Sequence, residues 1–172
     1  MLLVIDLQAK LVPALVEHET LMANVIWLVR AAQKIGVPVA ATEEYPKGLG
    51  PLVPEIRKLL PATAVAAKNH FSCVAAKILP ALPGNDRAQV VVIGAEAHVC
   101  VLQTALELLE DGKEVYVVAD AVASRSVGDR TIALTRMRDE GVRVVTREMV
   151  VFEWLCEAGT ALFREVNKEF LR

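Results

Sequence analysis

Three residues that can cooperate in nucleophilic chemistry, Asp6, Lys68 and Cys100, each follow a short apolar segment of the chain. A thiol attacks carbonyl carbons, a carboxylate accepts the thiol proton as a general base, and an ammonium group stabilises negative charge on both. Cys100 comes shortly after a glycine turn, where the pattern predicts the start of a helix. The positive end of that helix and the Lys68 ammonium are both expected to lower the pKa of the thiol.

Each of these residues also has an ordinary structural explanation. Asp6 could cap the following turn, Lys68 could be a solvated strand end, and Cys100 could be a small buried hydrophobic residue. Their joint appearance at equivalent strand ends favours the chemical interpretation. The other two cysteines, Cys73 and Cys156, fall on apolar stripes of predicted helices and are expected in the core.

The hydrophobic pattern predicts strands and helices that alternate along the chain. Apolar segments typical of buried strands occupy residues 2–5, 37–42, 63–67, 90–93, 114–119 and 142–146. Helices are predicted at residues 21–35, 54–60, 73–79, 100–111, 127–140, 148–156 and 160–170. The predicted fold class is α/β: a three-layer α/β/α sandwich with a mostly parallel, six-stranded open sheet, in one domain over residues 1–172. The carboxyl ends of such strands meet at one edge, where ligands bind.

Composition limits the classes of partner. The 172 residues carry a formal net charge of −2, so no basic surface indicates nucleic acid or an anionic membrane. Charged residues or proline interrupt every apolar run before the ~20 residues of a membrane span. The expected partner is a small-molecule substrate, and the 54% hydrophobic content favours a homo-oligomer. Three cysteines without regular spacing indicate a reducing cytoplasm rather than a disulfide framework.

Several segments resemble the isochorismatase-like cysteine hydrolases, which include isochorismatases, nicotinamidases and N-carbamoylsarcosine amidases. The matching segments are VIDLQ at residues 4–8, KNHFS at 68–72, GAEAHVCV at 94–101, VVADA at 117–121 and SRS at 124–126. The resemblance implies that Asp6 is the general base, Lys68 its electrostatic partner and Cys100 the nucleophile. It also implies a cis peptide between Ala95 and Glu96, which would direct the backbone N–H groups of Glu96 and Cys100 at an oxyanion.

The loop after the second predicted strand indicates which branch of this family the chain resembles. Residues 42–51, together with residues 100–105, resemble the isochorismatase domain-containing branch. Nicotinamidases carry an aspartate and two histidines in this loop, and these bind a divalent metal, whereas this chain has Glu43, Glu44 and Tyr45 there. The histidines at positions 18, 70 and 98 lie in separate segments without a metal-ligand spacing. We therefore expect no metal and no other cofactor.

The resemblance implies hydrolysis of a small amide-like (C–N) or related acyl substrate through a thioester. Candidate substrate-binding residues are Gln8, Tyr45, Leu49, Phe71 and His98, and ordinary packing or solvent exposure is the alternative for each. His98 is also an alternative base, although the fold usually brings catalytic pairs together from separate segments. The alternative function is a binding or scaffold protein that keeps the hydrolase fold with weak or no turnover.

Overall fold

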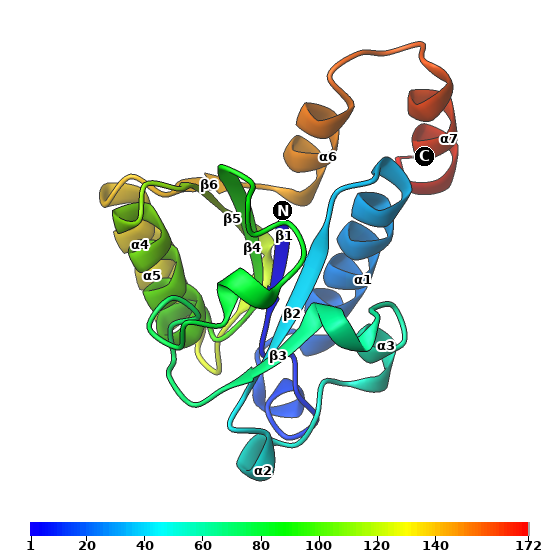
Figure 1. The fold of residues 1–172 in the computed structure, drawn as a ribbon. Coiled ribbons are helices and arrows are strands. Elements are labelled where there is room, and N and C mark those ends of the chain that lie inside the picture. Colours follow the sequence, from blue (N-terminus) through cyan, green and yellow to red (C-terminus); the bar gives the residue numbers. More distant parts are fainter. Residues whose placement is uncertain (172) are drawn as a thin grey trace.

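The structure is a computed structural model that describes residues 1–171, and a six-stranded sheet forms its centre (Figure 1). The strand order is β3-β2-β1-β4-β5-β6, and all neighbouring strands run parallel. The strands are β1 (Leu2–Ile5), β2 (Val39–Glu44), β3 (Val65–Lys68), β4 (Gln89–Ala95), β5 (Glu114–Ala123) and β6 (Arg143–Val145). The chain moves outward from β1 to β3 and then returns to β4 on the other side of β1. Ligands of open α/β sheets bind at such a reversal of strand order.

Helices cover both faces of the sheet and confirm the predicted three-layer α/β/α sandwich (Figure 1). One face carries α1 (His18–Ile35) and α6 (Arg147–Leu155), with α7 (Ala161–Phe170) packed against α1. The other face carries α4 (Leu102–Glu110) and α5 (Val127–Asp139). Two short helices, α2 (Pro46–Leu49) and α3 (Pro54–Arg57), lie in the connection between β2 and β3. None of the helices within residues 1–171 combines the length and the apolar character that crossing a bilayer requires.

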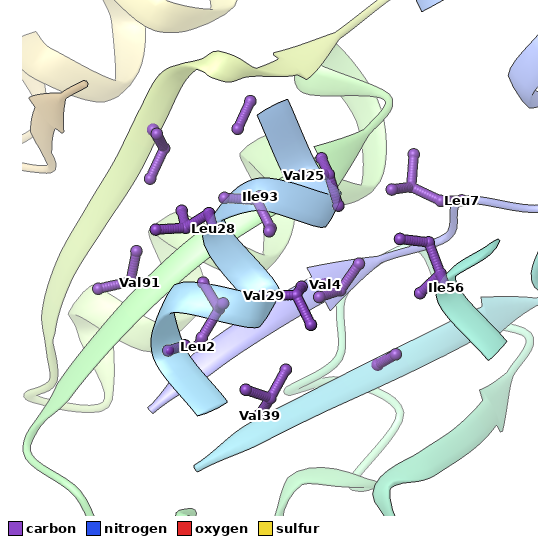
Figure 2. Close-up of a cluster of buried hydrophobic side chains, with 14 of the residues drawn as sticks. Leu2, Val4, Leu7, Val25, Leu28, Val29, Val39, Ile56, Val91 and Ile93 are labelled. Atoms are coloured by element: carbon purple, nitrogen blue, oxygen red, sulfur yellow. The ribbon is translucent and has the colours of Figure 1, made fainter. Parts of the chain in front are cut away.

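Strand β1 is buried on both faces because its residues alternate between two apolar clusters. Leu2 and Val4 pack with helix α1 in one cluster (Figure 2). Leu3 and Ile5 pack with residues of α4 in the other. Full burial of each such side chain contributes about 1.5–3 kcal/mol. This burial on both faces fixes the position of Asp6, which follows the strand directly.

The helix predicted at residues 73–79 is absent, and this prediction was wrong. The segment forms turns, followed by a short 3₁₀ turn at Leu79–Ala81. The Ser72 hydroxyl accepts hydrogen bonds from the N–H groups of Val74 and Ala75, and Lys77 has a φ of +56°. The Ser72 hydroxyl therefore caps a single turn, which the left-handed backbone of Lys77 ends before a helix can continue.

Two further predictions, both in the C-terminal half of the chain, were wrong. Strand β5 continues to Ala123 instead of ending at residue 119, so Asp120 lies inside it. The Asp120 carboxylate accepts a hydrogen bond from the N–H of Arg147 at 2.9 Å, at the start of α6. Cys156 is exposed rather than part of the core, because α6 ends at Leu155 and the chain turns away there. Cys73 is buried, as predicted.

Candidate active site

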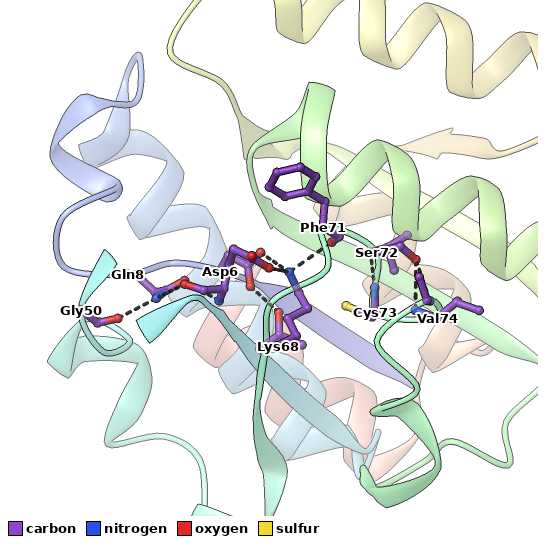
Figure 3. A network of polar contacts seen from close by, with 12 residues as sticks. Asp6, Gln8, Gly50, Lys68, Phe71, Ser72, Cys73 and Val74 are labelled. Carbon is purple, nitrogen blue, oxygen red and sulfur yellow. Dashed lines mark hydrogen bonds and ion pairs between the residues drawn. The ribbon is translucent and has the colours of Figure 1, made fainter. Parts of the chain in front are cut away.

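A buried ion cluster lies where β1, β2 and β3 end (Figure 3). The Nζ atom of Lys68 donates to Asp6 Oδ2 at 2.8 Å, to Glu44 Oε2 at 2.8 Å and to the carbonyl oxygen of Phe71 at 3.1 Å. The second Asp6 oxygen, Oδ1, accepts a hydrogen bond from Thr42 Oγ1 at 2.7 Å. The side chains of Lys68 and Asp6 are 0% exposed, and that of Glu44 is 9% exposed. These contacts hold the ammonium group and both carboxylates in fixed positions.

Asp6 and Lys68 lie next to each other, as their positions at the ends of predicted strands indicated. The sequence analysis did not predict that Glu44 joins them. A signal for it exists in β2. Thr42 and Glu44 are two residues apart, so they point to the same face of the strand. Both reach the cluster around Asp6.

Gln8 fixes the backbone that carries Glu44. Its Nε2 atom donates to the carbonyl oxygens of Glu44 at 2.9 Å and Gly50 at 2.6 Å, and its Oε1 atom accepts from the Glu44 N–H at 2.8 Å (Figure 3). Gln8 is fully buried. It therefore lies next to the cluster as a residue that positions Glu44, outside the cavity wall described below.

Cys100 lies in a π-helical turn, Ala97–Val101, between β4 and α4. Its Sγ atom is within 4.8 Å of carboxylate oxygens of both Asp6 and Glu44. The predicted helix therefore begins at Leu102, after the thiol rather than at it. The peptide bond between Ala95 and Glu96 is cis, at the position that the family resemblance implies. Within residues 1–171, the backbone N–H of Glu96 donates no hydrogen bond.

The surroundings of Cys100 favour the neutral thiol. Burial, followed by the negative charge of Asp6, raises the pKa of Cys100, and the opposing effect of the Lys68 ammonium is smaller. The expectation of a lowered pKa is thus wrong, because it counted the helix and Lys68 but not burial and the carboxylates. Burial works against the charge on Lys68, yet Asp6 and its neighbours raise the pKa of Lys68 above its ordinary value. The ammonium therefore stays charged at physiological pH.

The rate of thiol alkylation tests this electrostatic arrangement. At pH 8 we expect iodoacetamide to modify Cys100 more slowly than the exposed Cys156, with the Cys100 rate still rising above pH 9. Asp6→Asn removes the negative charge that opposes the thiolate, so the pKa of Cys100 falls and its rate at pH 8 increases. Peptide mapping by mass spectrometry separates the two thiols. A Cys100 profile that Asp6→Asn leaves unchanged, or moves to higher pH, would contradict the arrangement.

The donor atoms of Asp6, Glu44 and Cys100 lie close enough together to suit a metal ion. In this chain, however, the Lys68 ammonium bridges the two carboxylates. The positive charge that a metal would bring between them is therefore supplied by the protein itself.

A cavity of about 330 Å³ opens onto the cluster and is lined in part by Asp6, Glu44 and Cys100. Of the five predicted substrate-binding residues, Leu49 and Phe71 line it. Phe71 is half-exposed, and its carbonyl oxygen accepts from Lys68. The Cys100 thiol, the Asp6 carboxylate and the two apolar side chains thus line the same small space.

Two predicted binding residues lie elsewhere. Tyr45 has a left-handed backbone with a φ of +38°, and its side chain is exposed in a separate depression beside Lys47. His98 is outside the cavity wall, and its Nδ1 atom lies 2.9 Å from Ser124 Oγ. This position gives no support to His98 as the base.

Comparison with known proteins places this geometry in a family. A model of the isochorismatase domain matches residues 1–149. The chain is 39% identical to isochorismatase domain-containing protein 2 of Danio rerio, over 97% of this chain and 84% of that protein. It also resembles the solved structure of the MAR1 ribonuclease from Caenorhabditis elegans, with a TM-score of 0.88 and 35% identity over 99% of this chain and 88% of that chain.

A second solved structure, the Escherichia coli YcaC gene product, is described as an octameric hydrolase of unknown specificity. Its TM-score is 0.87, with 26% identity over 99% of this chain and 87% of that chain. The chain therefore belongs to the isochorismatase family of hydrolases, in the branch of the isochorismatase domain-containing proteins.

Proposed function

We propose that this protein is a cysteine hydrolase that cleaves the C–N bond of a small amide. One observation carries the proposal: the Cys100 thiol lies within 4.8 Å of the Asp6 carboxylate at the wall of a cavity, and the two oxygens of that carboxylate accept hydrogen bonds from Lys68 and Thr42. A nucleophile, a base and a group that orients the base are the parts that covalent hydrolysis needs. The description of the E. coli relative as a hydrolase agrees with this chemistry.

In the first half-reaction, the Cys100 proton moves to Asp6 while sulfur bonds to the carbonyl carbon. The raised pKa of Cys100 means that the proton leaves during attack rather than before it. Negative charge passes from Asp6 to the carbonyl oxygen, and backbone N–H groups of Glu96 and Cys100 are the proposed donors to that oxyanion. The C–N bond then breaks, Asp6 returns the proton to the leaving nitrogen, and a thioester remains.

In the second half-reaction, water attacks the thioester carbon and gives one proton to Asp6. The carbon–sulfur bond breaks, and the proton on Asp6 goes to the Cys100 sulfur. The products are an amine or ammonia and a carboxylic acid, and the enzyme regains its starting protonation. Throughout both steps the Lys68 ammonium holds Asp6 in place and limits the cost of moving charge within a buried site.

A screen of small primary amides with wild-type protein and Cys100→Ala tests the proposal. We expect the substitution to reduce turnover of every accepted amide by about 10⁴-fold or more, because no other group replaces the nucleophile. Cys156→Ala, which changes an exposed thiol, is the matched control and should keep full activity. Retained turnover in Cys100→Ala excludes the thiol mechanism, and an absence of any turnover in wild-type protein favours the binding-protein alternative.

RNA is the second substrate class to test, because the C. elegans relative is described as a ribonuclease. We propose a small molecule instead, on the net charge of −2 and the cavity of about 330 Å³. Labelled single-stranded RNA is therefore expected to remain intact in the presence of this protein. Cleavage that Cys100→Ala abolishes would overturn the small-molecule assignment.

We also propose that the protein forms a homo-oligomer through a surface that includes α5. Val127 and Ile132 on this helix are 59% and 70% exposed, and an interface between subunits would remove their apolar surface from water. The E. coli relative, described as octameric, supports this proposal. Light scattering after size-exclusion chromatography should give a multiple of the 18.7 kDa chain, reduced by Ile132→Glu. A monomer in wild-type protein would contradict it.

A further inference from the structure

One oxygen of the Glu44 carboxylate has no partner in the buried ion cluster. Oε2 accepts a hydrogen bond from Lys68 Nζ at 2.8 Å, and within residues 1–171 no hydrogen bond reaches Oε1. Every fully buried side-chain nitrogen or oxygen among these residues has a hydrogen-bond partner, so Oε1 is open to the cavity that Glu44 lines. The Glu44 side chain is only 9% exposed. Its free acceptor therefore faces the place where a substrate would bind.

Glu44 is held in place beside the proposed reacting atoms. The Gln8 side chain bonds to the N–H of Glu44 at 2.8 Å and to its carbonyl oxygen at 2.9 Å, which fixes the backbone. A carboxylate oxygen of Glu44, a carboxylate oxygen of Asp6 and the Cys100 Sγ atom all lie within 4.8 Å of one another. When a carbonyl carbon contacts Sγ, the nitrogen bonded to that carbon is therefore within reach of both carboxylates.

The floor of the cavity carries a net negative charge. The two carboxylates and one ammonium group of the buried ion cluster sum to −1. Two other cations line the cavity, but both are exposed and both have partners of their own. Lys10 donates to the Gly48 carbonyl oxygen at 2.9 Å, and Arg125 pairs with Glu96 at 2.9 Å. The floor therefore attracts N–H donors and groups that gain positive charge.

We propose that Glu44 binds the leaving nitrogen of the substrate through Oε1 and so selects primary amides over esters. A primary amide has two N–H donors beside its carbonyl carbon, whereas an ester has none. When Asp6 gives its proton to the nitrogen and the C–N bond breaks, the nitrogen gains positive charge and leaves as ammonia. Glu44 accepts a hydrogen bond during this step and takes no proton. The bond is strongest in the transition state and therefore accelerates the reaction. The inference rests on the proposed function and names its leaving group.

Amides and esters of the same acyl group test the inference, because both would form the same thioester at Cys100. The pairs are butyramide with methyl butyrate and benzamide with methyl benzoate, each measured on one preparation of each variant. In Glu44→Gln the introduced amide oxygen must face the Lys68 ammonium, which only donates, so an NH₂ group replaces Oε1 in the cavity. We expect the amide-to-ester ratio of kcat/KM to fall about 10- to 100-fold. Glu44→Asp, which keeps the carboxylate, should retain part of the ratio.

The ratio separates binding of the leaving nitrogen from an effect through Lys68. A change in the Lys68 position or in the folded fraction lowers both activities and cancels in the ratio. Glu43→Gln is the matched control, because Glu43 lies outside the cavity wall and bonds to the Leu52 N–H at 2.8 Å. It should leave the ratio unchanged. Loss of amide and ester hydrolysis in equal proportion in Glu44→Gln overturns the inference and leaves the hydrolase intact.

A binding measurement decides the inference if wild-type protein hydrolyses neither substrate, a result that rejects the hydrolase. The probes are butyramide and 2-pentanone, which has a methyl group in place of the NH₂ group. In Cys100→Ala protein, titration followed by ligand NMR should show about 10-fold tighter binding of the amide, and the added Glu44→Gln substitution should remove this preference. That result keeps Glu44 as the residue that binds the amide nitrogen. An amide that binds no more tightly than the ketone overturns the inference.

Discussion

Lys68→Met is expected to lower the free energy of unfolding by about 3–5 kcal/mol, because it leaves buried charges without their partner. The Nζ atom of Lys68 contacts carboxylate oxygens of both Asp6 and Glu44 at 2.8 Å. Methionine nearly fills the same volume but donates no hydrogen bond. The two carboxylates would then face each other within 4.8 Å, with Lys68 no longer between them. Urea denaturation at pH 7, followed by circular dichroism, measures the loss.

The loss of stability in Lys68→Met is expected to be smaller at lower pH. Without Lys68, repulsion between Asp6 and Glu44 raises the pKa of one carboxyl group in the folded state. Protonation of that group relieves the repulsion, so the stability difference from wild type should shrink as the pH falls from 8 to 5.

Two further variants control the Lys68→Met experiment. Glu44→Gln combined with Lys68→Met removes one of the two charges and should recover part of the stability. Lys34→Met breaks an exposed ion pair with Glu165 and should change stability little. A Lys68→Met protein that is no less stable than Lys34→Met would show that the buried cluster does not hold these charges together.

Gly94→Ala is expected to lower the free energy of unfolding by about 3–5 kcal/mol and to disturb the active site as well. Gly94 lies in β4 with a φ of +114° and pairs with Ile5 of β1. A Cβ atom there would lie 2.1 Å from the Ile5 carbonyl oxygen and 2.7 Å from the Ile5 nitrogen. Backbone atoms cannot rotate away as a flexible side chain can, so β1 and β4 must separate. Asp6 follows Ile5, and the displacement therefore reaches the proposed base.

Gly112→Ala is the matched control for this prediction. Gly112 has a similar left-handed φ of +80°, but an added Cβ meets no atom within 4 Å. Its expected cost is about 1–2 kcal/mol, from backbone conformation alone. The difference in the free energy of unfolding between the two variants, measured by urea denaturation, gives the cost of the steric clash between β4 and β1. Equal losses would show that this approach leaves room for a methyl group.

Loop residues show why part of the site could not be predicted. Gln8 and Tyr45 were expected in the cavity wall because they follow strands that lead to it. A φ of +50° at Asp6 and of +38° at Tyr45 changes the direction of the chain after β1 and β2. Gln8 consequently bonds to the backbone of Glu44 and Gly50, and Tyr45 turns out to solvent. Local sequence patterns do not specify such left-handed residues, because Asp and Tyr usually adopt negative φ.

The sequence by itself determined the parallel sheet and the meeting of Asp6 and Lys68 at its carboxyl edge, with Cys100 in the turn after β4. Strand boundaries follow from local apolar patterns, and parallel strands end on the same side. Only the tertiary structure decided that Glu44 joins them, that Glu96 pairs with Arg125, and that burial and Asp6 raise the pKa of the Cys100 thiol. These properties depend on burial and on charges that come from distant segments, and both act through distances in space rather than along the chain.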